Sequence, residues 1–300
     1  MTTTIGFLGL GRMGAPMAAN LLKAGHNLLV HDVSAEAVGA LVAQGAKAAG
    51  SAAALGEACD VVFTSLPTPA IVREAVLGAD GIVAQGRPRI ICDLSTSGPK
   101  LAQELADALA PVGVAGFDAP VSGGIKGAVE ATISIMVGGG PLALYEAELE
   151  PLLKAIGKPT HMGETPGAGQ TMKLVNTLLG AVAIGVTAEG MAFGIKQGLD
   201  PARMIAVLNQ STGINSATRD KWPKSVLPRT FDFGFAAALS LKDTRLLMDE
   251  AEAAGVPLPL GRIVEGYLEA TLAREGPDAD FTAIAKVVEE AAGLDPERRN

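Results

Sequence analysis

One lysine of this chain has neighbours that suit acid–base chemistry. Gly169, Lys173, Asn176 and Gly180 follow one another at spacings of three and four, so they share one face of a long helix predicted over residues 167–198. A lysine on a helix is usually a solvated charge. The apolar residues beside this one favour partial enclosure, and burial of a lysine lowers its pKa toward the range of acid–base catalysis. Lys173 is therefore a candidate catalytic group, and a surface charge is the other interpretation of the same spacing.

A second segment could hold an anion. Ser122 stands at the end of a strand-like stretch and is followed by Gly123 and Gly124. Two glycines after a serine can expose consecutive backbone N–H groups and one hydroxyl, which together form a small anion nest. An ordinary turn is the alternative interpretation.

A glycine-rich segment near the start could bind a dinucleotide. Gly9, Gly11 and Gly14 fit G-x-G-x-x-G between a predicted strand at 4–8 and a predicted helix at 15–24. In this motif the first glycine makes the turn, the second admits a pyrophosphate, and the third lets the helix pack on the strand. A lone match is weak in a chain with 37 glycines, and a turn that binds nothing is the alternative, but the order of strand, turn, helix and strand supports binding. The predicted loop comprises Gly9, Leu10, Gly11, Arg12, Met13 and Gly14.

An acidic residue at the end of the second predicted strand bears on the choice of cofactor. Asp32 stands 18 residues after Gly14, close to the ~20-residue offset at which a carboxylate binds the ribose hydroxyls. Its charge would repel a 2′-phosphate, and Val33 and Ser34 follow it where an arginine would be needed. These residues favour NAD over NADP.

The elements that must position these residues form two kinds of structure. Short apolar strands alternate with helices up to about residue 163, which predicts an α/β domain with a Rossmann-type doubly wound sheet at 1–163. Ligands lie beyond the carboxyl ends of such strands, which places Leu66 and Pro67 near the cofactor. We expect a long interdomain helix at 164–198 and an all-helical C-terminal domain at 199–300.

The apolar residues of the long helix and the prolines of a later segment predict different structures. The apolar centre of the helix, Leu178 to Ala188, spans eleven residues, fewer than the ~18 of a membrane candidate, so it predicts a buried helix. The segment from Gly213 to Phe235 contains two prolines and predicts a long functional or interface loop.

Composition excludes several classes of partner. The net charge of −8 and the absence of a basic run argue against nucleic acid or an anionic membrane. Cys59 and Cys92 match no metal or redox spacing and are interpreted as reduced core thiols, and no other metal motif occurs. Residues 1–3 lead directly into the first strand, which leaves no room for a signal peptide and predicts a cytoplasmic protein, or a mitochondrial one with its presequence removed.

Four motifs in one order carry a family resemblance. They are G-F-L-G-L-G-R-M-G-A-P-M-A-A-N-L-L-K-A-G, D-A-P-V-S-G-G, G-A-G-Q-T-M-K-L-V-N and F-x-x-x-L-S-L-K-D. Across essentially the full chain they resemble the β-hydroxyacid dehydrogenase family, which includes 3-hydroxyisobutyrate dehydrogenases and tartronate semialdehyde reductases. The related 6-phosphogluconate dehydrogenases are considerably longer, and imine reductases share the architecture but generally lack the lysine that stands at position 173.

The resemblance implies roles for particular residues. Lys173 would be the catalytic residue and Asn176 would orient the substrate, although some members carry that asparagine where this chain has Thr177. Lys242, which by itself would belong to a surface ion pair, would close over the site. The implied cofactor site comprises Gly9 to Gly14, Asp32, Val33, Leu66, Pro67, Thr96 (near the nicotinamide) and Lys242, and the implied substrate site comprises Ser122, Gly123, Gly124, Lys173 and Asn176.

Together these observations predict an NAD-dependent oxidoreductase that interconverts a small 3-hydroxy carboxylate and its semialdehyde or keto acid. The family and the apolar helical half also suggest a homodimer or homotetramer. A non-catalytic dinucleotide-binding module used for assembly is the alternative from another class, and an imine reductase is the alternative among enzymes. The residues that would distinguish 3-hydroxyisobutyrate-like, glycerate-like, serine-like and four-carbon acids carry no motif that identifies one of them.

Overall fold

The computed structural model describes residues 3–297. The chain forms two compact units, which divide between Lys173 and Leu174, inside the long helix α9 (Ala168–Lys196). The helix predicted as an interdomain element therefore contributes its first six residues to one unit and the rest to the other. Residues 163 and 198 remain predicted domain boundaries.

The described part of the first unit is built on one nine-stranded sheet, with the order β3-β2-β1-β4-β5-β6-β8-β7 and β9 paired with β8. From β3 to β6 all neighbours are parallel, and β8 runs antiparallel to both β6 and β7. The chain order reverses between β1 and β4, the position at which doubly wound sheets bind ligands. The strands are β1 (Thr4–Leu8), β2 (Asn27–His31), β3 (Lys47–Ala48), β4 (Val61–Thr64), β5 (Ile90–Asp93), β6 (Ala115–Asp118), β7 (Val121–Ser122), β8 (Ile133–Gly139) and β9 (Gly157–Gly163).

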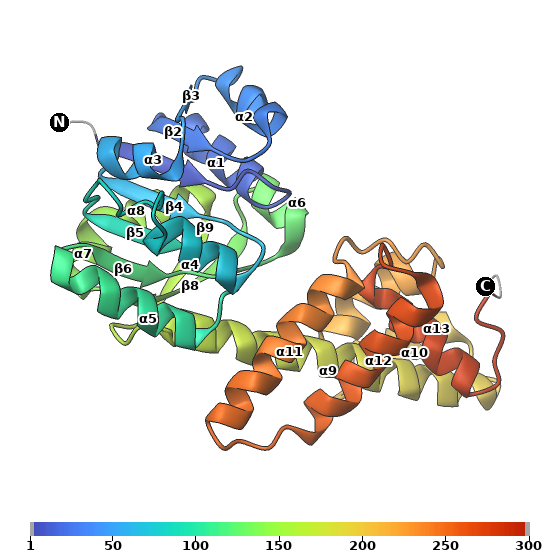
Figure 1. Ribbon diagram of the computed structural model, residues 1–300. Helices are drawn as coiled ribbons and strands as arrows, with labels where there is room; N and C mark the ends of the chain where they lie inside the picture. The colour runs from blue at the N-terminus through green and yellow to red at the C-terminus, as the bar shows by residue number, and fades with distance from the viewer. Residues whose placement is uncertain (1–2, 298–300) are drawn as a thin grey trace. The chain divides into compact units, whose positions relative to one another are not determined.

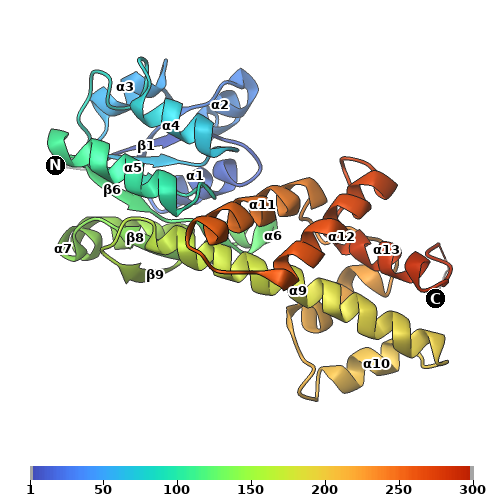
Figure 2. The same cartoon turned by 60° about the horizontal axis from the view of Figure 1, so that its bottom comes forward.

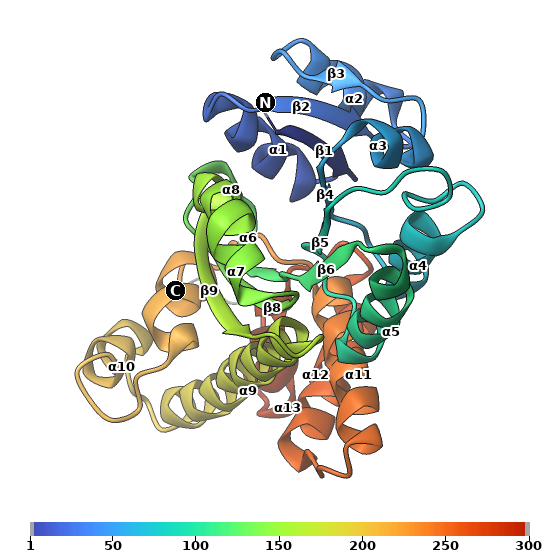
Figure 3. The same cartoon turned by 90° about the vertical axis from the view of Figure 1, so that its left-hand side faces the viewer.

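Helices cover both faces of this sheet (Figures 1 and 3). One face packs against α1 (Gly14–Lys23), α2 (Ala35–Val42), α6 (Gly124–Val129) and α8 (Glu150–Ile156), through a core that includes Phe7, Met17 and Leu153. The other face packs against α3 (Ala52–Ala58), α4 (Pro69–Leu77) and α5 (Pro99–Leu109), with Val76 and Leu105 in its core. The connecting segments are η1 (Ala110–Val112), α7 (Leu142–Leu144) and the π-helix η2 (Tyr145–Leu149). The predicted doubly wound sheet is confirmed.

The second unit is helical in its described part. Figure 2 shows α10 and the pair α11–α12 on opposite sides of the C-terminal half of α9. Its core contains Ile184, Trp222 and Leu268 among others. Its elements after α9 are α10 (Pro201–Leu208), the π-helix η3 (Ala217–Val226), α11 (Ala237–Ala253), α12 (Pro259–Glu275), η4 (Phe281–Ala283) and α13 (Ile284–Ala291).

One predicted loop is wrong. Residues 217–226, inside the predicted loop, form η3, which contains Pro223. The Leu227 N–H bonds the Trp222 carbonyl oxygen, five residues back, at 2.8 Å. A proline lacks an N–H and clashes in a regular α-helix, so its presence suggested a loop, but burial of Trp222 holds this wider turn in place.

The expectation for α9 also needs correction. By length and composition α9 is apolar enough to cross a membrane, with a mean hydropathy of 1.7 over its best window, although only 44% of that window is buried. Ile184 and Met191 lie in the core of the second unit, whereas Leu179 and Phe193 are 65% and 71% exposed. A core helix can pass the same composition test, so α9 is weak evidence for a membrane span, and it is buried on one side only.

Candidate active site

The three motif glycines occupy the positions that their spacing predicts. Gly9 has a φ of +94°, which favours glycine, and a Cβ there would lie 2.3 Å from the Ser65 carbonyl oxygen. A Cβ on Gly14 would lie 2.0 Å from the Gly9 carbonyl oxygen, so the start of α1 packs directly on the turn. Gly11 is exposed, and a Cβ there would meet nothing within 4 Å. The loop therefore has one open backbone position between two closed ones.

The start of α1 has no side-chain cap, as is also true of α6 and α8, which pack beside it. Ser34, Ser51 and Thr68 cap α2, α3 and α4 with their side chains, whereas Met13 at the start of α1 makes no side-chain cap. Uncapped N–H groups at a helix start are a site for a phosphate. The open glycine and this helix start fit the pyrophosphate of a dinucleotide.

Asp32 connects the glycine loop to the turn after β2. Its Oδ2 accepts a hydrogen bond from the Leu10 N–H at 2.6 Å, and its Oδ1 accepts one from the Ser34 N–H at 2.7 Å. Val33 beside it is 102% exposed. The carboxylate is thus fixed at the edge of the loop, as the ribose-binding interpretation requires.

The loops after β4 and β5 are joined by side chains. The Leu66 N–H donates to Ser95 Oγ at 2.8 Å, and Thr64 Oγ1 donates to Asp93 Oδ1 at 2.7 Å. Thr96 is half-buried, and Pro67 is exposed at the end of its loop. Both loops lie beyond carboxyl ends of parallel strands, β4 next to β1 and β5 next to β4, at the edge where the sequence placed the cofactor.

Lys173 is brought to the serine–glycine segment. Its Nζ donates a hydrogen bond to the Val121 carbonyl oxygen at 2.8 Å, one residue before Ser122. Gly123 and Gly124 follow with φ values of +139° and +66°, and both are exposed. These left-handed positions turn the chain sharply between β7 and α6. The structure therefore places a lysine ammonium beside the candidate carboxylate nest.

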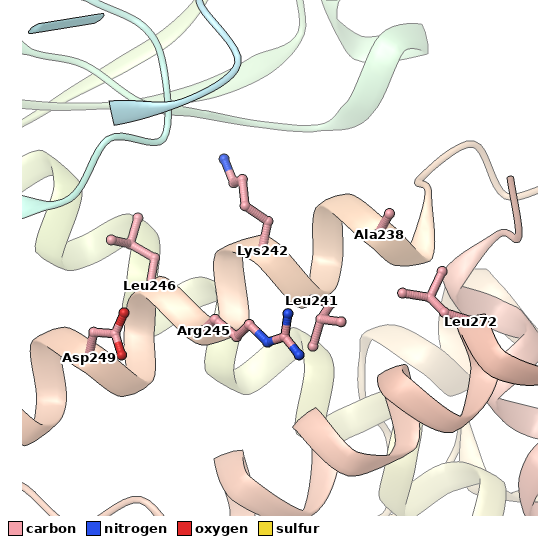
Figure 4. Close-up of a pocket in the computed structure, with 7 residues that line it drawn as sticks. All are labelled: Ala238, Leu241, Lys242, Arg245, Leu246, Asp249 and Leu272. Atoms are coloured by element: carbon pink, nitrogen blue, oxygen red, sulfur yellow. The ribbon is translucent and has the colours of Figure 1, made fainter. Parts of the chain in front are cut away.

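Two predicted residues belong to the second unit. Asn176 lies one helical turn after Lys173 on α9, and Asn176 and Thr177 are both half-buried, so which of them faces the substrate remains a prediction. Lys242 pairs with Asp243 Oδ1 at 2.9 Å on α11. Lys242, Arg245 and Leu272 line a hollow of about 450 Å³. Figure 4 shows the Lys242 side chain projecting from α11.

No role was predicted for three buried polar residues, Asp93, Asp118 and Gln170. Burial raises the pKa of Asp93, against the opposing effect of hydrogen bonds from Ser95, Ser97 and Thr64. Burial also raises the pKa of Asp118 to about 6, and backbone N–H groups of Gly167 and Gln170 offset part of the effect. Both aspartates end buried strands, and Asp118 and Gln170 stand inside two of the quoted motifs, which is the signal that could have identified them.

The fold and the loop geometry define a class, the nicotinamide dinucleotide-dependent oxidoreductases. A family model described as the NAD binding domain of 6-phosphogluconate dehydrogenase matches residues 4–165, and one described as NAD-binding of NADP-dependent 3-hydroxyisobutyrate dehydrogenase matches residues 167–288. The chain belongs to the β-hydroxyacid dehydrogenase family, and it is an enzyme that acts on the CH–OH group of a 3-hydroxy acid.

Relatives of known activity span the whole chain. The 3-hydroxyisobutyrate dehydrogenase of Pseudomonas aeruginosa is 40% identical over 296 residues, which cover 95% of this chain and 98% of that one. The NAD-dependent L-serine dehydrogenase of the same organism is 37% identical over 296 residues, covering 96% and 99%. The structure of Mycobacterium tuberculosis 3-hydroxyisobutyrate dehydrogenase with L-serine is 36% identical, with a TM-score of 0.87 and coverage of 96% and 99%.

Proposed function

We propose that the chain reversibly oxidises a 3-hydroxypropanoate with one small group at C2, and that it prefers NAD to NADP. The hydrogen bond from Lys173 Nζ to the Val121 carbonyl oxygen carries this proposal, because it brings an acid–base group to the turn that would hold a carboxylate. 3-Hydroxyisobutyrate and L-serine, which the relatives' names specify, share this skeleton and differ only in the group at C2. Glycerate has the same skeleton with a hydroxyl at C2.

Each site residue has its own role in this proposed reaction. The Ser122 hydroxyl and the N–H groups of Gly123 and Gly124 bind the substrate carboxylate. Lys173 accepts the proton of the substrate hydroxyl during oxidation, and its ammonium returns a proton to the carbonyl oxygen in the reverse direction. Asn176 orients the substrate through its amide. A bound nicotinamide would accept the hydride, and the protein would position the substrate beside it.

The cofactor preference rests on Asp32. Its carboxylate is held by the Leu10 and Ser34 N–H groups, so it cannot turn away without breaking two hydrogen bonds. A 2′-phosphate at the same edge would meet this negative charge, whereas two ribose hydroxyls can donate to it. The L-serine dehydrogenase named above is NAD-dependent, which supports the same preference.

The assembly and compartment proposals rest on the exposed surface and on the thiols. Leu179, Val186, Phe193 and Val207 of the second unit are each more than half exposed, and burying such side chains favours a homodimer or homotetramer. The molar mass in solution, measured by light scattering for the wild type and for Phe193→Glu, tests this: a monomeric wild type contradicts it. Cys59 and Cys92 are free and buried, which suits a cytoplasmic location.

The test of the activity is absorbance of reduced nicotinamide with NAD and with NADP, across 3-hydroxy acids of increasing size at C2. We expect NAD-linked oxidation of an acid with a small C2 group. Binding of NAD without turnover of any acid would favour the non-catalytic binding module. Activity confined to imine reduction would instead support the imine reductase alternative.

A further inference from the structure

Gln170 connects the start of α9 to the loop after β5. The side chain is fully buried, with 0% of its surface exposed. Its Oε1 accepts hydrogen bonds from the Ser97 and Gly98 N–H groups, both at 3.1 Å, and its Nε2 donates to the Ser95 carbonyl oxygen at 2.8 Å. These three bonds surround Thr96. A buried amide that is bonded at both ends holds the loop in one conformation.

The same helical turn is fixed from the strand side. Asp118 ends β6 and is 4% exposed, and its Oδ1 accepts from the Gly167 N–H and its Oδ2 from the Gln170 N–H, both at 2.8 Å. A carboxylate at a helix N-terminus occupies donors that the helix itself cannot satisfy and complements the helix dipole. A Cβ on Gly169 would lie 2.1 Å from the Met136 carbonyl oxygen, so the first turn of α9 rests directly on the backbone of β8.

Lys173 follows Gln170 by three residues, so the two side chains leave α9 on the same side and one turn apart. The lysine reaches the Val121 carbonyl oxygen, and the glutamine reaches the Ser95–Gly98 loop. One rigid helical turn thus sets the distance between the loop that carries Thr96 and the segment that carries Ser122.

We propose that Gln170 is a positioning residue, which fixes the proton acceptor Lys173 relative to the Thr96 loop. The proposal rests on the proposed function, since that function gives Lys173 the proton transfer and the Thr96 loop the nicotinamide. Asp118 holds the same turn from the other side. Small misplacements of reacting groups are costly, about 10²-fold for ~1 Å, so loss of the amide should slow the chemical step more than binding.

The test compares three variants of the full chain. Gln170→Met keeps the side-chain length and removes all three hydrogen bonds, whereas Gln170→Glu keeps an acceptor for the Ser97 and Gly98 N–H groups. Gln44→Met is the matched control, because that amide is exposed and bonds the Ala40 carbonyl oxygen far from the loop. In Gln170→Met we expect kcat to fall ~10²-fold while KM and the Kd of NAD change by less than about threefold. Gln170→Glu should give an intermediate kcat, and Gln44→Met should match the wild type.

Two further measurements do not depend on kcat alone. The kinetic isotope effect with substrate deuterated at the carbinol carbon should rise in Gln170→Met, because hydride transfer becomes more rate-limiting. Hydrogen exchange should become faster in peptides 94–101 and 119–125 and stay unchanged in β1.

These measurements distinguish a positioning role of Gln170 from a role in general stability and from failure of the proposed function. A kcat within about threefold of the wild type, or faster exchange at 94–101 without a change at 119–125, would overturn the positioning role. Loss of NAD binding with faster exchange throughout the sheet would also overturn it and assign Gln170 to general stability. If the wild type binds NAD but oxidises no 3-hydroxy acid, the proposed function fails, and the exchange comparison alone still decides whether Gln170 positions Lys173.

Discussion

The two units use their polar residues differently. In the first unit, buried polar side chains join segments that are distant in sequence: the Gln170 amide bonds the Ser95 carbonyl oxygen 75 residues away. In the second unit, polar side chains often bond their own or a neighbouring helix, as Thr271 bonds the Tyr267 carbonyl oxygen four residues back and exposed Arg245 pairs with Glu269. Long-range buried hydrogen bonds fix the relative positions of loops, whereas exposed ion pairs contribute little. We therefore expect changes to the buried polar network of the first unit to alter chemistry, and changes to exposed ion pairs of the second unit to leave it unchanged.

Two lysines on the same helix test this contrast most strongly. Lys173 belongs to the first unit, and Lys196, near the other end of α9, donates to the Ala292 carbonyl oxygen at 2.9 Å. Lys173→Ala should lower kcat by ~10²- to 10⁴-fold with NAD still bound, because positioned acid–base groups contribute on that scale. Lys196→Ala should keep kcat within about twofold. Steady-state kinetics and NAD titration measure both, and wild-type-like turnover in Lys173→Ala would refute the assignment.

Asp118 gives the first unit a dependence on pH. Its pKa of about 6 in the folded protein lies above the ordinary value of 3.8, because burial disfavours the charged form. Between about pH 4 and pH 6 the folded state therefore binds more protons than the unfolded state, and the free energy of unfolding falls as pH rises through this window, by about 3 kcal/mol in total.

Denaturant unfolding between pH 4 and 7.5 measures this effect. Asp118→Asn should reduce the slope, leaving the contribution of Asp93, whose pKa burial also raises. It should also destabilise the protein by about 1–3 kcal/mol, because its amide turns an NH₂ toward a backbone N–H. Asp107→Asn, on the exposed side of α5, should keep the wild-type slope. An equal slope in Asp118→Asn and the wild type would show that other groups titrate.

Substitution of two glycines, one in each unit, should affect NAD affinity and protein stability separately. The expected effects are smaller than those above. Apart from the adjacent residues and, for Gly190, the backbone of α9 itself, no atom of the described chain lies within 4 Å of a Cβ on Gly11 or on Gly190. Gly11→Ala should leave the melting temperature unchanged and weaken NAD binding by about tenfold or more, because the methyl group enters the space of the pyrophosphate.

Gly190→Ala is the matched change in the second unit. It should stabilise α9 by up to ~1 kcal/mol, because alanine is the better helix former, and should leave the Kd of NAD unchanged. Calorimetry measures the melting temperature of both variants, and NAD titration measures their Kd for NAD. Unchanged NAD affinity in Gly11→Ala would place the pyrophosphate elsewhere.

The smallest effect concerns the edge of the cofactor loop. Asp32→Asn removes a negative charge but keeps the size of the side chain, so the preference for NAD over NADP should narrow by several-fold, as ratios of kcat/KM. An unchanged ratio would mean that other residues select the cofactor.

Much of the first unit could be predicted from local patterns. The bounds of β1 agree with the predicted strand at 4–8, because it is a short apolar run that ends at a clear glycine turn. The two-residue strand β3 and helix α3 were not predicted, because neither has a long periodic pattern. The wrong loop at η3 has the same origin, since Pro223 is a local signal and the burial of Trp222 is a tertiary one.

The candidate site divides in the same way. The sequence by itself determined which residues could do chemistry: the glycine spacing, the acidic end of β2, the serine–glycine turn and the lysine of α9 can all be read along the chain. Only the tertiary structure showed that the Lys173 ammonium meets the Val121 carbonyl oxygen, and that Asp118 and Gln170 hold the turn between them. The reason is physical. Spacing along a helix or strand fixes which side chains share a face, but a hydrogen bond across 52 residues exists only after the sheet has brought its strand ends to one edge.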